Sequence, residues 1–153
     1  MSANRRFPLS APQRGLWLFQ QLDPRNPVLS IGDVLEIRGV IDPEVYRAAI
    51  RQVVREAEAL RIRIGVEGDD VFQYLVDPDT VKVTVVDLSD EPDPDAAAEA
   101  HMSAGFDQAM DPTQDPLFAP ELLKLAEDRH LSYHRFHHVS VDGWSMGLVA
   151  RRL

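Results

Sequence analysis

Hydrophobic and polar positions along the chain repeat with two different periods, so the pattern predicts both helices and strands. The strongest helical pattern starts at Asp42, which precedes a proline and is a favourable N-cap. The apolar residues that follow at spacings of three and four are Tyr46, Ala49, Val53, Ala57 and Leu60. Ser10 and Gln13 match a capping box, which predicts a shorter helix running to about Leu22.

Strand-like segments account for much of the remaining chain. They cover residues 34–38, 61–66, 71–76, 81–88, 117–126 and 131–139. Turn-forming residues 67–70 predict a hairpin, and residues 127–130 connect the last two segments. Residues 87–95 form an acidic connector, the alanine-rich stretch 95–110 predicts a helix, and a last helix begins near Ser145. The mixture predicts an α/β (α+β) sandwich with a mixed, mostly antiparallel sheet flanked by helices.

Composition narrows the possible classes of function. The 153 residues are 44% hydrophobic and 27% charged, which fits one globular domain or one lobe of a larger one. A formal net charge of -9 argues against a nucleic-acid partner, because phosphate binding depends on clustered Lys and Arg. The absence of Cys excludes a thiol nucleophile, a disulfide and a cysteine metal site. The first residues lack an apolar signal segment, so no membrane partner is expected and the expected location is cytoplasmic.

Candidate chemistry gathers near the end of the last predicted strand. Alternation along a strand places His134 and His138 on one face and His137 on the other, so the two adjacent imidazoles point apart. They are poorly placed to ligate one metal ion, and no metal site is expected. On spacing alone, one core histidine and one solvent-facing histidine explain the pattern better than catalysis does.

The residues after the two histidines favour a functional site over two purely structural histidines. Asp142 and Gly143 lie where the strand must turn into a helix. A glycine there permits a positive φ or the close approach of a ligand, and a buried Asp needs a cation or several donors. Strand ends of this kind often carry binding and catalytic groups.

The segment 143–147 also matches G-x-S-x-G, the nucleophile elbow of α/β-hydrolases, with Ser145 as the nucleophile. That fold places its acid and its histidine after the serine. Only eight residues follow Ser145, and none of them is Asp, Glu or His. A serine hydrolase fragment is therefore the weaker reading.

Three sequence motifs follow one another along the chain in the order in which they occur in a known protein family. His137, His138, Asp142 and Gly143 form the pattern His-His-x-x-x-Asp-Gly, which resembles the signature of condensation domains of nonribosomal peptide synthetases, members of the chloramphenicol acetyltransferase-like superfamily. The segment 10–17 resembles the opening motif of that family in its residues Ser10, Gln13, Leu16 and Trp17. The segment 56–64 resembles the second motif in Glu58, Leu60 and Arg61. Pro12, Gly15 and Ala57 differ from the most common form of these motifs, and in this the chain looks closer to condensation domains of siderophore synthetases.

The resemblance implies a function and a set of roles. Family members form an amide between a donor acyl or peptidyl thioester and the amine of an acceptor aminoacyl thioester. Both substrates arrive on phosphopantetheine arms of donor and acceptor carrier proteins, and no cofactor is bound directly. His138 would be the catalytic residue and His137 a structural one. Asp142 would pair with Arg61, and Gly143 would let a backbone amide approach the thioester.

The resemblance also implies an incomplete domain. Residues 7–153 would form the amino-terminal lobe, after a disordered segment 1–6, and the carboxyl-terminal lobe of family members has no counterpart in these residues. Since the substrate tunnel of the family lies between two lobes, the isolated lobe should be inactive and should expose an apolar patch. Leu16 and Trp17 should pack in the core or between the lobes. The open alternative is a non-catalytic lobe or interaction module.

Overall fold

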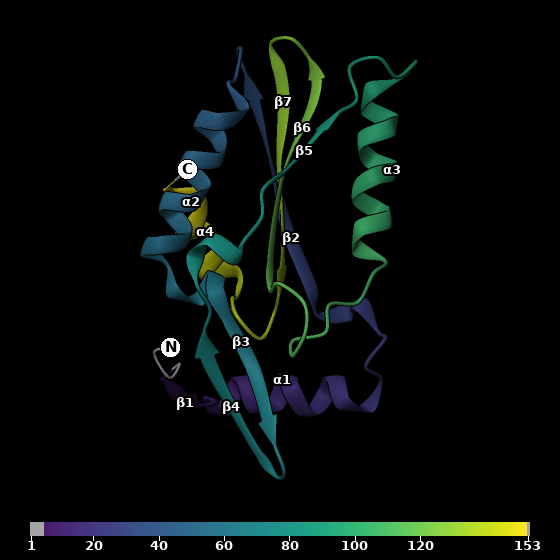
Figure 1. Ribbon diagram of the computed structural model, residues 1–153. Helices are drawn as coiled ribbons and strands as arrows, with labels where there is room; N and C mark the ends of the chain where they lie inside the picture. Colours follow the sequence, from purple (N-terminus) through teal and green to yellow (C-terminus); the bar gives the residue numbers. More distant parts are fainter. Residues whose placement is uncertain (1–4, 153) are drawn as a thin grey trace.

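The computed structural model describes residues 5–152, and its elements follow one another as Figure 1 shows. The α-helices are α1 (Ala11–Leu22), α2 (Pro43–Glu56), α3 (Pro94–Phe106) and α4 (Gly143–Ala150). The strands are β1 (Arg6–Pro8), β2 (Ser30–Arg38), β3 (Ile62–Glu67), β4 (Asp70–Leu75), β5 (Thr84–Asp87), β6 (Phe118–Ala126) and β7 (Arg129–His137). Three short 3-10 helices are η1 (Pro27–Leu29), η2 (Glu58–Arg61) and η3 (Pro78–Thr80). No helix within residues 5–152 has the length and apolar character needed to cross a membrane.

Two sheets organise the chain. The larger sheet has the order β2-β7-β6-β5, in which β5 and β6 are parallel and the other pairs are antiparallel. The smaller sheet has the order β1-β4-β3 and is antiparallel throughout. The predicted sandwich with a mixed, mostly antiparallel sheet is confirmed.

Helices cover both faces of the larger sheet, with α2 and α4 on one side and α3 on the other (Figure 1). The alternation along β7 explains the two cores. Phe136 packs with Ile50 and Val54 of α2, whereas Tyr133 packs with Ala98 of α3 on the opposite face. Since helices pack on both faces of the sheet, side chains of β7 are buried on either face.

A third cluster joins α1 to the smaller sheet. Its buried members are Leu9, Ile62, Ile64, Leu117 and Val139, with Leu16 and Trp17 packed against them. The prediction that Leu16 and Trp17 serve packing is confirmed. This cluster places α1 beside the end of β7, where the candidate residues lie.

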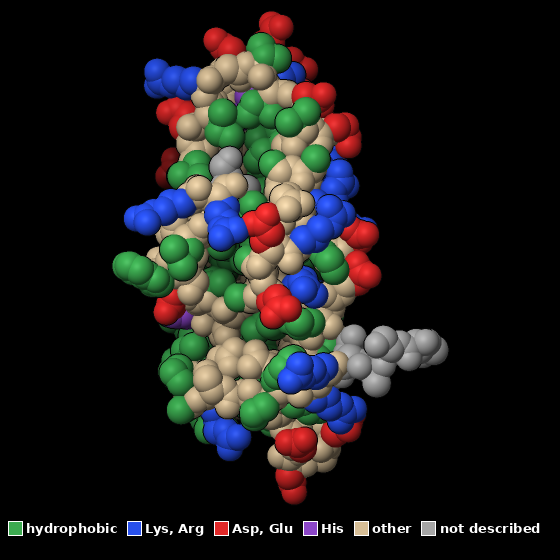
Figure 2. All heavy atoms as spheres, turned by 90° about the vertical axis from the view of Figure 1, so that its left-hand side faces the viewer, with side chains coloured by type: hydrophobic (Ala, Val, Ile, Leu, Met, Phe, Trp, Pro, Cys, Tyr) green, Lys and Arg blue, Asp and Glu red, His purple; other side chains and the backbone are tan. Residues whose placement is uncertain are grey.

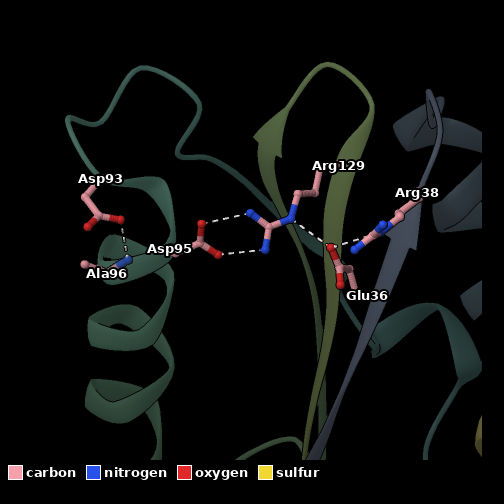
Figure 3. A network of polar contacts seen from close by, with 6 residues as sticks. All are labelled: Glu36, Arg38, Asp93, Asp95, Ala96 and Arg129. Carbon is pink, nitrogen blue, oxygen red and sulfur yellow. Dashed lines mark hydrogen bonds and ion pairs between the residues drawn. The ribbon is translucent and has the colours of Figure 1, made fainter.

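At the opposite end of β7, polar contacts fasten α3 to the sheet (Figure 3). Arg129 donates two hydrogen bonds of 2.8 Å to the carboxylate of Asp95 in α3, and its Nε donates to Glu36 of β2. Such a two-pronged guanidinium contact fixes orientation better than a single charge pair. All three side chains are partly exposed, so the network contributes little free energy and mainly fixes the angle of α3.

Several element boundaries differ from the expected ones: β2 begins earlier, at Ser30, β5 covers only Thr84–Asp87, α3 ends at Phe106 and β7 ends at His137. The second helix ends at Glu56 rather than continuing past Leu60, which lies in η2 but is still buried. Only residues 127 and 128 form the turn between β6 and β7, because the ladder extends to Arg129. Strand β1 was not expected; Arg6 lies in it, within the segment 1–6 predicted to be disordered, while residues 1–4 of that segment lie outside the described part.

Candidate active site

The candidate residues lie where β7 turns into α4. The strand ends at His137, residues 138–140 form a turn, and Asp142 is the N-cap of α4. Backbone hydrogen bonds from His137 N to Leu117 O (3.0 Å) and from His138 N to Leu29 O (2.8 Å) hold this end on both sides. The two histidines therefore start from a rigid backbone.

His137 is enclosed and fully bonded. Its side chain is 1% exposed, and its Nδ1 accepts a hydrogen bond from Val139 N at 3.0 Å. The proton of the neutral ring must then be on Nε2, which donates to Gln20 Oε1 at 2.6 Å. Burial lowers the pKa of His137 to about 4, and the neighbouring His138 adds to the effect. This environment suits a neutral structural histidine.

His138 is bonded on one side only. Its Nδ1 lies 3.0 Å from Val141 O, so Nδ1 carries a proton and donates a hydrogen bond to that carbonyl. In the neutral ring Nε2 then has a free lone pair, and no residue within 5–152 forms a hydrogen bond with it. The half-buried ring lines a pocket of about 520 Å³ between the first turn of α1 and the start of α4. A fixed imidazole with an open Nε2 can accept a proton or a hydrogen bond from a group that enters the pocket.

Gln13 joins three elements beside this pocket. It completes the predicted capping box with Ser10, with hydrogen bonds of 2.9 and 3.4 Å. Its Nε2 also donates to Val139 O at 3.2 Å, and its amide faces the amide of Gln73 in β4 at 3.0 Å. A second pocket of about 490 Å³ lies on the β4 side of Gln13. The first turn of α1 is thereby tied to the turn that carries His138.

Asp142 does not have the surroundings that the sequence suggested. It is exposed and accepts hydrogen bonds from Ser145 N (2.8 Å) and Ser145 Oγ (2.6 Å), which lower its pKa. The predicted pairing of Asp142 with Arg61 is wrong. Arg61 instead donates to Val76 O at 3.2 Å and lies 3.5 Å from Glu58 Oε1, because it sits at the base of the β3–β4 hairpin.

The other two expectations for this turn concern Gly143 and Ser145. Gly143 does not have a positive φ, and a Cβ placed on it would meet nothing within 4 Å. Its backbone therefore does not require glycine in this structure. Ser145 lies in the first turn of α4, where its hydroxyl donates to Asp142. A nucleophile elbow needs a strained turn and a bonded histidine, and Ser145 has neither.

A second polar cluster lies in the middle of β7, and sequence reasoning missed it. His134 is fully buried; its Nδ1 is 2.8 Å from Asp33 Oδ1 and its Nε2 is 2.9 Å from Ser132 Oγ. The Ser132 hydroxyl is 2.7 Å from the hydroxyl of Tyr46, whose pKa burial raises to about 12. The register of β2 against β7 pairs Asp33 with His134, and the packing of α2 on the sheet adds Tyr46.

Gln20 is the second missed residue, although a signal for it exists. Gln13, Leu16, Trp17 and Gln20 follow the i, i+3, i+4, i+7 spacing of one helix face, and Gln20 is 4% exposed. A glutamine on the buried stripe of a helix requires internal partners. Across residues 5–152, no three His, Cys, Asp or Glu side chains are grouped as metal ligands.

Comparisons with known proteins show which family the chain belongs to. The condensation domain model matches residues 3–153. The dimodular nonribosomal peptide synthase of Bacillus subtilis is 35% identical over 147 residues, which are 96% of this chain and 6% of that protein. Isonitrile lipopeptide synthase of Streptomyces coeruleorubidus is 37% identical, over 97% of this chain and 10% of that protein. Enterobactin synthase component F of Escherichia coli is 28% identical, over 98% and 12%.

Among solved structures, the starter condensation domain of rhizomide synthetase superposes with a TM-score of 0.91 and 41% identity. The match covers 97% of this chain and 36% of that one. A mutant of that domain has been solved in complex with C8-CoA and Leu-SNAC.

The fold is that of the chloramphenicol acetyltransferase-like class, whose condensation members are acyltransferase-type enzymes. Within this class, the chain belongs to the condensation domain family of nonribosomal peptide synthetases. The chain spans about a third of the solved neighbour and about a tenth or less of the first two curated relatives.

Proposed function

We propose that this chain is the amino-terminal lobe of a condensation domain that joins two carrier-bound thioesters through an amide bond, with His138 as the catalytic residue. The observation that carries the proposal is the one-sided bonding of His138. Its Nδ1 proton is held by Val141 O, while Nε2 stays open beside a pocket. His137, next to it, has no free nitrogen.

In the proposed reaction, the acceptor amine attacks the carbonyl carbon of the donor thioester. The nitrogen–carbon bond forms, the carbon–sulfur bond breaks, and the amine proton passes to the departing sulfur. Nε2 of His138 accepts a hydrogen bond from the amine and takes the proton as the amide forms. An α-amino group with a pKa of about 7.7 is already partly deprotonated at neutral pH, so orientation is the larger contribution. Holding two reactants in register supplies an effective molarity of about 10⁵ M or more.

The proposed partners follow from the family. Donor and acceptor carrier proteins would deliver the substrates on phosphopantetheine arms, which are parts of the substrates rather than bound cofactors. The complexes of the rhizomide synthetase domain with C8-CoA and Leu-SNAC support thioester substrates of both kinds. The similarity to enterobactin synthase component F supports a siderophore as one class of product.

A second lobe is the other proposed partner. Apolar side chains are spread over the face formed by α2 and α4 (Figure 2). Exposed apolar residues on these two helices include Val45 (65%), Trp144 (78%) and Leu148 (48%). We infer that a second lobe covers part of this surface and that residues 1–153 alone do not condense substrates. Gel filtration of the isolated chain at high concentration should show self-association, and a clean monomer would count against the inference.

A single-turnover assay tests the proposed function. The chain is supplied with the rest of the domain, in cis or in trans, and with loaded donor and acceptor carrier proteins. His138→Ala should lower the rate of amide formation about 10²- to 10⁴-fold, whereas Ser145→Ala should have almost no effect. If both variants match the wild type, His138 is a structural residue and the catalytic role proposed for it is wrong.

A further inference from the structure

Gln20 is a buried polar residue to which the proposed reaction assigns no role. It lies on the inward face of α1, 4% exposed, and its amide is bonded at both ends. Oε1 accepts from His137 Nε2 at 2.6 Å, and Nε2 donates to Met110 O at 3.0 Å. The residue therefore connects α1, the segment after α3 and the end of β7.

We propose that Gln20 is a positioning residue that holds His137 in its neutral Nε2–H form and thereby shapes the turn that presents His138. This inference rests on the proposed role of His138. The hydrogen bonds run in one direction, from Val139 N–H to His137 Nδ1, from His137 Nε2–H to Gln20, and from Gln20 to Met110 O. Each donor in this series of three hydrogen bonds faces an acceptor.

The orientation of the Gln20 amide follows from its neighbours. His137 Nδ1 already accepts from Val139 N–H, so its Nε2 must be a donor and requires an oxygen opposite. Met110 O requires a donor. A flipped amide would place two donors against each other at His137 and two acceptors at Met110. Neither a carboxylate nor a hydrocarbon can replace both ends of a glutamine amide, and an unpaired buried group is costly.

Protonation of His137 would break this series of hydrogen bonds at the turn, where Val139 N–H donates to Nδ1. The imidazolium carries a proton on Nδ1, which would face the N–H of Val139 without an acceptor between them. Burial has the largest effect on the pKa of His137 and lowers it; of the titratable neighbours, His138 also lowers this pKa and Asp111 raises it. Gln20 is neutral and adds no charge that favours the imidazolium.

The first test follows the His137 ring by nitrogen-15 NMR in the 153-residue chain. The wild type should show a slowly exchanging Nε2 proton and no protonation of His137 above about pH 5. Gln20→Leu should remove the protection of that proton. Gln20→Glu should raise the pKa of His137, because a carboxylate opposite Nε2 favours the charged ring. Gln21→Leu changes the next, exposed residue of α1 and should match the wild type.

The second test applies the amide-formation assay to the same variants. Gln20→Leu should lower kcat about 10- to 100-fold with little change in the KM for the acceptor, since the amine pocket is intact but His138 is misplaced. Gln20→Glu should approach wild-type kcat at alkaline pH and lose activity as pH falls through the raised pKa of His137. If Gln20 had a merely structural role, the pH at which kcat falls on the acidic side would not change in Gln20→Glu.

The outcomes separate the inference from the proposed function. An unchanged Nε2 proton and an unchanged titration of His137 in both Gln20 variants would overturn the inference, even where His138→Ala abolishes activity. A Gln20→Glu pH profile that overlays the wild type would also overturn it. If His138→Ala is fully active, the catalytic part fails with the proposed function, and the NMR result still shows whether Gln20 sets the tautomer.

Discussion

The middle of strand β7 and the turn that follows its end each have a histidine with a serine and an aspartate nearby, and the two regions differ in access to solvent. In the middle of the strand, Asp33, His134 and Ser132 form an acid–imidazole–hydroxyl array with distances of 2.8 and 2.9 Å. Ser132 is 2% exposed and His134 is fully buried. At the end of the strand, His138 has one bonded nitrogen and lines a pocket.

The comparison shows that hydrogen-bond geometry alone does not make an active site. The array in the middle resembles a catalytic triad in its distances, yet no substrate carbonyl can reach the Ser132 hydroxyl. All of its donors have acceptors, so it acts as a polar contact between β2, β7 and α2. The end of the strand has fewer internal bonds, and this leaves Nε2 of His138 available for chemistry.

The largest expected effect on stability separates the two regions directly. His134→Ala should lower the free energy of unfolding by about 3 kcal/mol, since it removes a buried ring and leaves Asp33 and Ser132 without their shared partner. His138→Ala should cost less than about 1 kcal/mol, because its ring is partly exposed and holds one carbonyl. Urea denaturation of both variants measures the difference, and equal losses would contradict the distinction.

The pH dependence of stability sharpens the comparison between His137 and His138. The pKa of His137 is about 4 in the folded chain, against about 6.5 when unfolded. Between these values the unfolded chain binds more protons, so stability is full above about pH 6.5 and falls as pH decreases toward 4, by on the order of 3 kcal/mol.

Denaturation at pH steps across this window measures the slope. His137→Leu should flatten it, while carboxylates with lowered pKa, such as Asp142, act only at more acidic pH. An identical slope in wild type and His137→Leu would show that His137 does not fold as a neutral ring.

Within the buried array, substitutions of Tyr46 and Ser132 should have smaller effects on stability, and the two effects should not be additive. Tyr46→Phe and Ser132→Ala should each lower stability by about 1 kcal/mol, because each removes one hydrogen bond and leaves a buried partner unpaired. A double-mutant cycle should give an interaction energy of at least about 0.5 kcal/mol. Simple additivity would mean that the two hydroxyls do not share a hydrogen bond in solution.

The smallest effect is expected at the start of α4. Ser145→Ala removes a hydroxyl bonded to the exposed Asp142, but alanine favours the helix and the Ser145 N–H remains bonded. Stability should change by about 0.5 kcal/mol or less, as followed by thermal denaturation. A large loss would give Ser145 a role that neither its contacts nor the amide-formation proposal provides.

Most elements could be predicted because their signals are local. The capping box of Ser10 and Gln13, the Asp42 cap and the 67–70 turn involve neighbours in sequence, and all three have the expected geometry or position. Strand β1 gave no signal, since three residues are too few for a period. The end of α2 was misplaced because the buried Leu60 continues the helical spacing into a 3-10 helix.

The sequence by itself determined the family, the mixed sandwich and the position of His138 at a strand-to-helix turn, because these depend on short-range order and on motifs. The tertiary structure alone decided which side chains form hydrogen bonds with one another. It gave Arg61 to the β3–β4 hairpin instead of Asp142, placed Gln20 against His137 from 117 residues away, and set Asp33 beside His134 across 101 residues. Strand order and register make such contacts, and no local pattern encodes which distant side chain will fill a buried hydrogen bond.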